Sequence, residues 1–136
     1  MSKKTIYEVG LLNNGLSVIR RQYIGSAELS QSLILVGELL SAIQAFSTTA
    51  YYEIPEVFQM EDFITSLYRF KCGGEENFYL LYAICKASTT YIRKALGNLA
   101  IELKTYDTIL LSWNIDTESL RNLYPIFDEL FLPFNK

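Results

Sequence analysis

The chain has 136 residues, of which half are hydrophobic and 14% are aromatic, and its formal net charge is −3. This length matches one domain, and a chain this rich in apolar residues is not disordered. The charges are scattered without a run of Lys or Arg, which excludes the basic surface that nucleic acid or an anionic membrane requires. We expect one domain over residues 1–136 that binds no nucleic acid and meets membranes only through partners.

Cysteine usage and hydropathy indicate a cytoplasmic protein. Cys72 and Cys85 are too few for a disulfide framework, so we expect two buried thiols in a reducing compartment. Residues 1–5 lack the apolar core of a signal peptide. The longest uncharged stretch, residues 39–52, is shorter than the roughly 20 apolar residues that a membrane span needs.

The chain opens with a predicted β-hairpin. Residues 5–12 and 16–24 are β-prone and flank Asn13-Asn14-Gly15. Asn-Gly between two such runs is a strong hairpin signal, because both residues tolerate a positive φ.

A helix is predicted next, over residues 26–47. Ser26 can cap its first turn, and Glu28 lies where a carboxylate favours the helix dipole. Two neighbouring apolar stripes follow at helical spacing, which predicts a wide buried face. Their members are Leu29, Leu33, Val36, Leu40 and Ile43, and Leu35, Leu39, Ala42 and Phe46.

Three further strands are predicted in the middle of the chain. Residues 57–72 are β-prone and divide into strands near 57–62 and 63–72. Residues 73–77 begin with Gly73-Gly74 and form a turn, and residues 78–85 are apolar at every position. A run without alternation indicates a strand that is covered on both faces.

Two helices are predicted at the C-terminal end. Ser88, Thr89 or Thr90 caps the first, which continues as far as Leu110 through Ile92, Leu96, Leu99, Leu103 and Tyr106. Residues 114–117 break the pattern, and Asp116 or Thr117 caps a second helix marked by Leu120, Leu123, Phe127 and Leu130 and closed by Pro133. Pro125 predicts a kink or a late helix start, because proline inside a helix lacks a donor and clashes with the preceding turn.

The predicted order is β-β-α-β-β-β-α-α. We expect a mixed α/β (α+β) fold with a five-stranded antiparallel sheet, one helix on one face and two on the other. This arrangement buries every apolar stripe and covers both faces of the strand at residues 78–85.

The residues that catalysis usually needs are missing or dispersed. The chain has no histidine, no GxGxxG and no GxxxxGK, which removes the commonest general base, most zinc sites and both phosphate-binding loops. The acidic pairs Glu61-Asp62, Glu75-Glu76 and Asp128-Glu129 are adjacent in sequence, so their side chains diverge. We interpret these pairs as solvated surface and expect no enzyme activity, no cofactor and no metal.

The helix over residues 26–47 offers the candidate partner-binding site. If its stripes face the sheet, Ile34 remains exposed among polar neighbours beside the small Gly37. Ile34, Gly37, Glu38 and Ser41 then surround a hollow that can dock a partner protein or a second copy in a homodimer. An isolated exposed isoleucine explains Ile34 equally well.

Ile101 has a similar setting beside Gly97, Asn98 and Thr105. For this residue we expect the last helix to cover the side chain.

The element order and the stretch Leu123-Tyr124-Pro125-Ile126-Phe127-Asp128-Glu129-Leu130-Phe131-Leu132 resemble longin domains, nearest to the small chains of clathrin-adaptor and coatomer complexes. The predicted helix from Tyr91 to Tyr106 and the pair Tyr68-Arg69 are weaker similarities. The resemblance implies a profilin-like fold and a non-catalytic role in vesicle traffic. Its implied partners are sister longin or roadblock domains, large coat subunits, small GTPases or sorting peptides. Pro125 departs from the family pattern, in which this helix is smooth.

Two functions follow as alternatives from this resemblance. The first is an interaction subunit of an adaptor, coat or tethering complex, and the second is a regulator that binds a small GTPase through a longin or roadblock platform. An actin-binding profilin is less consistent, because profilins begin with a helix. A small-molecule sensor needs a pocket that the sequence does not show.

Overall fold

The computed structural model describes residues 6–13, 16–23, 57–59, 64–74, 77–86 and 90–135. Within them lies an antiparallel sheet with the strand order β2-β1-β5-β4-β3. Four strands have seven or eight residues: β1 (Ile6–Asn13), β2 (Leu16–Gln22), β4 (Ile64–Lys71) and β5 (Phe78–Cys85). The fifth, β3 (Val57–Gln59), is a three-residue segment at the edge. The predicted class, a mixed α+β fold with an antiparallel sheet, is confirmed.

The predicted hairpin and the predicted strand at residues 78–85 are both present. β1 pairs with β2 and with β5, so β1 and β5 are central in the sheet. All of β5 except its first residue is buried, as its unbroken apolar sequence indicates. Gly73 and Gly74 form the turn after β4 with φ values of 81° and 133°, which side chains rarely tolerate.

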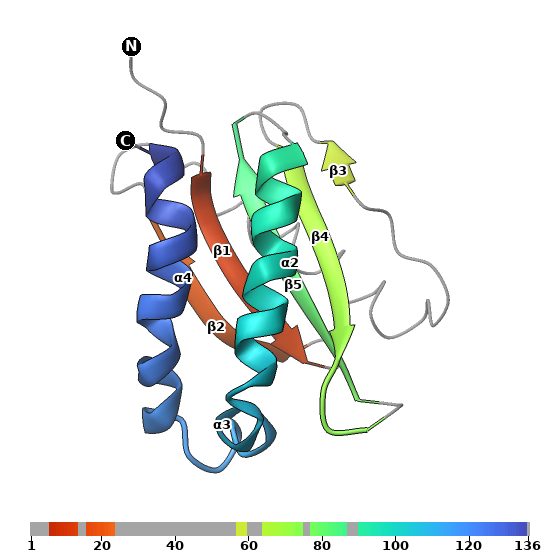
Figure 1. Ribbon diagram of the computed structural model, residues 1–136, viewed down its shortest axis with the longest axis vertical. Coiled ribbons are helices and arrows are strands. Elements are labelled where there is room, and N and C mark those ends of the chain that lie inside the picture. Colours follow the sequence, from red (N-terminus) through yellow and green to blue (C-terminus); the bar gives the residue numbers. More distant parts are fainter. Residues whose placement is uncertain are drawn as a thin grey trace.

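Helices cover one face of this sheet (Figure 1). α2 (Thr90–Lys104) lies beside α4 (Tyr124–Phe131), and the two run in opposite directions. Between them the chain forms the short α3 (Asp107–Leu111) and the 3-10 segment η1 (Glu118–Leu123), and a second 3-10 segment, η2 (Leu132–Asn135), follows α4.

Our prediction of one continuous helix as far as Leu110 is wrong. α2 ends at Lys104, a turn at residues 105–106 follows, and α3 starts at Asp107. Tyr106 is 42% exposed, whereas Leu110 is buried. The turn lets Leu110 meet the core: its carbonyl accepts a hydrogen bond of 3.0 Å from the buried Tyr79 hydroxyl.

The late helix start at Pro125 is confirmed. α4 begins at Tyr124, so the proline lies in the first helical turn, where the missing N–H has no helical partner to lose. The residues before it form the 3-10 segment η1, whose start is stabilised by Asp116: its carboxylate accepts hydrogen bonds from the Ser119 amide and hydroxyl.

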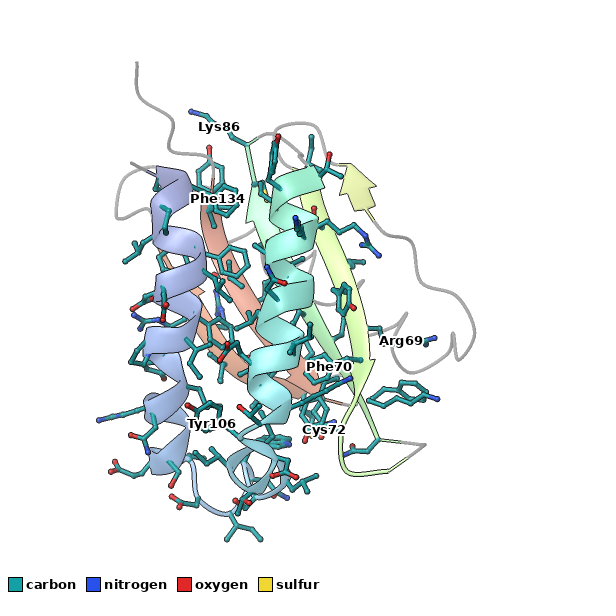
Figure 2. All side chains as sticks on the ribbon, in the orientation of Figure 1. Arg69, Phe70, Cys72, Lys86, Tyr106 and Phe134 are labelled. Carbon is teal, nitrogen blue, oxygen red and sulfur yellow. The ribbon has the colours of Figure 1, made fainter. Side chains whose placement is uncertain are left out.

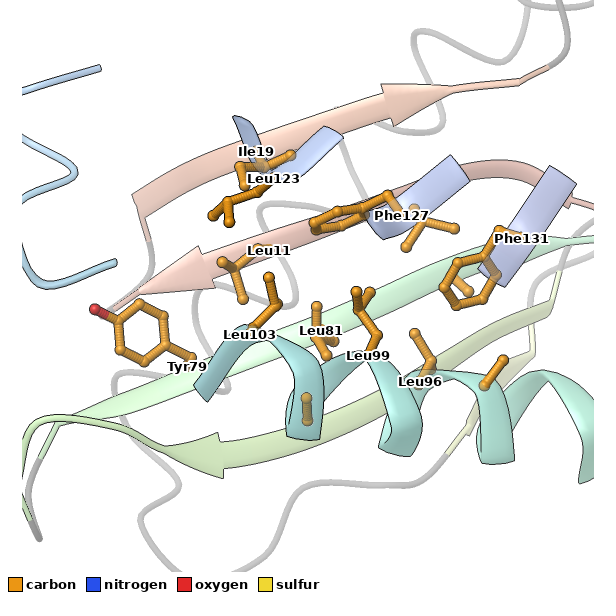
Figure 3. Close-up of a cluster of buried hydrophobic side chains, with 14 of the residues drawn as sticks. Leu11, Ile19, Tyr79, Leu81, Leu96, Leu99, Leu103, Leu123, Phe127 and Phe131 are labelled. Carbon is orange, nitrogen blue, oxygen red and sulfur yellow. The ribbon is translucent and has the colours of Figure 1, made fainter. Parts of the chain in front are cut away.

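The core fills the space between α2, α4 and the sheet (Figure 3). Leu96, Leu99 and Leu103 of α2 face Leu123, Phe127 and Phe131, while the strands contribute Leu11, Ile19, Tyr79 and Leu81. Phe131 rather than the predicted Leu130 is the fully buried residue in the last turn of α4. Burial of apolar side chains at about 25 cal/mol per Å² is the main stabilising term of this layer.

Two sets of polar side-chain hydrogen bonds lie at the two ends of β1. The Asn135 side chain accepts a hydrogen bond of 2.8 Å from the Ile6 amide and donates one of 2.9 Å to the Ile6 carbonyl. At the opposite end of β1, the Trp113 indole donates to the Asn13 side chain at 3.0 Å, and Asn13 donates to the Phe78 carbonyl at 2.9 Å.

Candidate interaction surface

The outward side of α2 carries two exposed apolar side chains, Tyr91 and Ile101. Tyr91 is 73% exposed and Ile101 is 65% exposed, and Lys94 and Asn98 lie between them at spacings of three and four residues. Residues at these spacings share one side of a helix. The opposite side of α2 is buried on the sheet through Ile92, Leu96, Leu99 and Leu103.

Our expectation that the last helix covers Ile101 is wrong. α4 lies beside α2 over β1 and β2, whereas β4 lies on the other flank of α2 (Figure 1). Ile101 lines a shallow hollow on that flank, with a volume of about 390 Å³. This α2 hollow is lined by Tyr68, Thr90, Arg93, Lys94, Gly97, Asn98 and Ile101.

Gly97 and Tyr68 shape the α2 hollow. A Cβ atom at Gly97 would lie 3.5 Å from the Tyr68 ring. Because glycine has no side chain, the space over the ring at this point of α2 stays open. The Tyr68 ring is half-buried, packs against the core and forms an apolar part of the lining of the hollow. Beside it, the Arg93 guanidinium donates to the Leu67 carbonyl and lies 5.7 Å from the centre of the Tyr68 ring.

Two cations, Arg93 and Lys94, line the α2 hollow although the chain is acidic overall. Residues 64–74 and 90–104 include Arg69, Lys71, Arg93, Lys94 and Lys104, against the single acidic residue Glu102. Three of these cations lie over aromatic rings: Arg69 and Lys71 over Phe78 at 4.7 and 5.3 Å, and Lys104 over Phe70 at 6.0 Å. Figure 2 shows Phe70 beside the lower half of α2 and Arg69 on the outer side of β4.

A buried carboxylate lies on the other face of the sheet. Glu8 has no exposed surface and accepts hydrogen bonds from Arg20 at 2.9 and 3.2 Å, Gln22 at 3.3 Å and the Tyr82 hydroxyl at 2.6 Å. Burial, and then the Glu8 charge, raise the pKa of Tyr82, while the hydrogen bonds to Glu8 raise the pKa of Arg20. A carboxylate with both oxygens occupied in this way is typical of a structural ion pair.

Our interpretation of the pair Asp128-Glu129 as solvated surface is wrong for Asp128. Glu129 is exposed, but Asp128 is partly buried and accepts two hydrogen bonds from Arg21, at 2.8 and 3.3 Å, and one from Tyr23, at 3.0 Å. Arg21 also lies 4.4 Å from the centre of the Tyr124 ring. The other two acidic pairs, Glu61-Asp62 and Glu75-Glu76, lie outside the described residues.

The candidate residues Ile34, Gly37, Glu38 and Ser41 also lie outside the described residues, together with the whole predicted helix at 26–47. Of the surface features that the sequence indicates, the structure therefore describes the one around Ile101. Sequence reasoning found Ile101, Gly97 and Asn98 but missed Arg93 and Tyr68. Arg93, Gly97 and Ile101 follow one another at intervals of four residues, so helical spacing could have identified Arg93 as a neighbour of Ile101. Tyr68 could be identified only from the packing of α2 on β4.

The two cysteines are free and buried, as predicted. Among the described residues, no group of three His, Cys, Asp or Glu side chains is close enough to hold a metal ion. No helix in the described part of the chain is long and apolar enough to cross a membrane. No protein-family model matches the chain, and no curated protein sequence matches it either.

Proposed function

We propose that the chain is a non-catalytic, longin-like interaction subunit of the adaptor, coat or tethering type, and that it docks a partner protein at the α2 hollow. The observation that carries this proposal is the exposed Ile101, which shares the α2 hollow with the half-buried Tyr68 ring. Two cations, Arg93 and Lys94, line the same hollow. Exposed apolar side chains gathered around a hollow are typical of binding surfaces.

The longin-like part of the proposal has separate support. The chain starts with the hairpin β1–β2, places β5 beside β1, and ends with helices on one face of the antiparallel sheet. The C-terminal stretch that resembles adaptor small chains forms α4, whose Asp128 anchors β2.

The partner segment at the α2 hollow should combine an apolar side chain with acidic neighbours. The apolar group would cover Ile101 and Tyr68, and the acidic groups would approach Lys94 and Lys104. Charge complementarity of this kind accelerates association and selects among partners more than it adds affinity.

The test is a pull-down with three preparations: the chain itself, Ile101→Asp, and Ile115→Asp as a matched control. Ile115 is 85% exposed, lies in the segment after α3 and does not line the α2 hollow. The prey are purified large coat subunits and small GTPases loaded with GDP or with a GTP analogue. We expect coat subunits to bind the chain and Ile115→Asp, and binding to Ile101→Asp to fall at least tenfold.

Other outcomes separate the alternatives. Capture of a GTPase in one nucleotide state only would favour the regulator function over the adaptor function. Equal capture by Ile101→Asp and by the unchanged chain would remove the α2 hollow as the docking site.

A further inference from the structure

A second surface lies along β2, the edge strand at the opposite end of the sheet from β3. β2 is the terminal strand of the order β2-β1-β5-β4-β3, so within the described residues no strand pairs with its outer side. Such an edge leaves backbone donors and acceptors unpaired, and these can template a strand from another chain.

The hydrogen bonding of β2 shows which groups point outward. The Tyr23 amide donates to the Tyr7 carbonyl of β1 at 2.9 Å. Along an antiparallel strand, the N–H and C=O groups of successive residues point alternately to the two neighbouring sides. The N–H and C=O groups of Arg21 and Ile19 therefore also point toward β1. Arg20 and Gln22 therefore direct their backbone N–H and C=O groups to the free edge.

The usual protection of an edge strand is weakened here. Charged side chains normally protect such an edge, and β2 carries Arg20 and Arg21. However, Arg20 reaches across one face of the sheet to Glu8, and Arg21 reaches across the other face to Asp128. Both guanidinium groups are thereby drawn toward the strand's own domain and away from the edge.

Two hollows lie along β2. The first, about 300 Å³ in volume, lies between Ser17 and Val18 of β2 and a wall that includes Trp113, Leu120 and Tyr124. We call it the tryptophan hollow. The second, about 430 Å³, opens over Arg20, Arg21 and Gln22. Together they follow the strand along most of its length.

The charges argue against a second copy of this chain as the occupant. The extra residue Val18 interrupts the pairing of β2, which leaves residues 19–22 as its regular part. Antiparallel pairing of two such edges about a twofold axis at Arg20 or at Arg21 places identical arginines directly opposite, which is destabilising. Glu8 is wholly buried while the Arg20 side chain is 36% exposed, so an approaching strand meets the cation first.

We propose that the free edge of β2 is a strand-addition site for an extended segment of a partner protein, which places an apolar side chain in the tryptophan hollow and a carboxylate beside Arg20. The backbone of that segment pairs with Arg20 and Gln22. This site is separate from the α2 hollow, and the proposal does not depend on what binds there.

The first experiment selects a ligand and maps it. A display library of nine-residue peptides with alternating apolar and polar positions, Asp and Glu included, is screened against the full chain. We expect the recovered peptides to contain an acidic residue and to slow amide hydrogen exchange at Arg20 and Gln22 about tenfold. The failure to recover any peptide, or protection confined to amides outside β2, would overturn the proposal.

The second experiment tests the backbone pairing itself. Methylation of alternate peptide nitrogens removes the donors that strand addition needs, and loss of two such bonds should weaken binding at least tenfold. Gln22→Pro, which removes an outward amide of β2, should weaken it similarly, whereas Ile101→Asp should bind the peptide normally. Undiminished binding of the methylated peptide would refute the proposal even if Gln22→Pro fails to fold. A dimer that protects the β2 amides without peptide would identify a second copy as the occupant instead.

Discussion

Arg21 and Asp128 are 107 residues apart in sequence and joined by two hydrogen bonds, from Nη2 to Oδ2 at 2.8 Å and from Nε to Oδ1 at 3.3 Å. Their side chains are 30% and 28% exposed, so the pair is partly shielded from water. It connects the edge strand β2 to α4. The hydroxyl of Tyr23 adds a third bond to the same carboxylate, and burial, followed by this contact, raises the pKa of Tyr23.

Replacing Asp128 should therefore loosen β2 from α4. We expect Asp128→Asn to reduce the free energy of unfolding by about 1–2 kcal/mol, because Arg21 loses its paired charge while Tyr23 keeps an acceptor. Urea denaturation followed by circular dichroism measures this change. The matched control is Glu129→Gln, an exposed neighbour that should change stability by less than about 0.5 kcal/mol. Equal effects of the two substitutions would contradict the structural role of the pair.

The two partners of the buried pair Glu8–Arg20 should respond unequally to substitution. Arg20→Met leaves a carboxylate with no exposed surface and no cation, which should cost about 3 kcal/mol. Glu8→Gln leaves a guanidinium that is already 36% exposed and can gain water, so we expect a smaller loss of about 1–2 kcal/mol. The unfolding free energies of both variants test this order, and a larger loss for Glu8→Gln would refute it.

Two glycines should respond to alanine in opposite directions. A Cβ atom at Gly10 would lie 2.3 Å from the ring of Tyr82, which is fully buried and donates a hydrogen bond to Glu8. We expect Gly10→Ala to destabilise the fold by about 2–3 kcal/mol. Gly97→Ala, inside α2, meets only the Tyr68 ring at an ordinary 3.5 Å and should stabilise the helix by about 0.5–1 kcal/mol. Thermal melting of the two variants shows whether the signs differ.

Alkaline pH should weaken the fold through Cys85. Burial raises the pKa of this thiol to about 12, whereas the thiol of an unfolded chain has a pKa of about 8.5. Above pH 8.5 the unfolded state has lost a proton that the folded state keeps, so the free energy of unfolding falls as pH rises toward 12. The slope can reach about 1.4 kcal/mol per pH unit.

The measurement for Cys85 compares urea denaturation of the chain and of Cys85→Ala at pH 7, 8.5 and 10. The alanine variant starts less stable, because it has lost a buried sulfur, but its stability should fall less steeply with pH. Buried tyrosines such as Tyr82 contribute at the high end of this range in both proteins, so they do not affect the difference in slope. Parallel slopes would contradict the assignment to the thiol.

Local patterns in the sequence were sufficient for much of the fold. The Asn-Gly signal located the hairpin of β1 and β2, and an unbroken apolar run located β5 at residues 78–85. Proline chemistry predicted a kink or a late helix start at Pro125, and α4 begins one residue before this proline. Each of these depends on neighbours along the chain, which is the information that a sequence carries directly.

The break between α2 and α3 did not follow from the sequence. The apolar positions through Leu110 keep helical spacing, yet the chain turns after Lys104 so that Leu110 can meet Tyr79 of β5. A contact between residues 31 positions apart offsets the free energy that is lost by interrupting the helix. Periodicity within one segment contains no information about such a contact.

For the charged residues, too, the sequence supplied the composition and the tertiary structure supplied the environment of each side chain. The sequence by itself determined that the chain has no histidine, two cysteines and scattered charges. Only the tertiary structure decided that Glu8 and Asp128 are paired while Glu129 is solvated, and that Ile101 stays exposed. The physical reason is that pairing and exposure depend on which elements pack together, as the pairing of Arg21 in β2 with Asp128 in α4 shows.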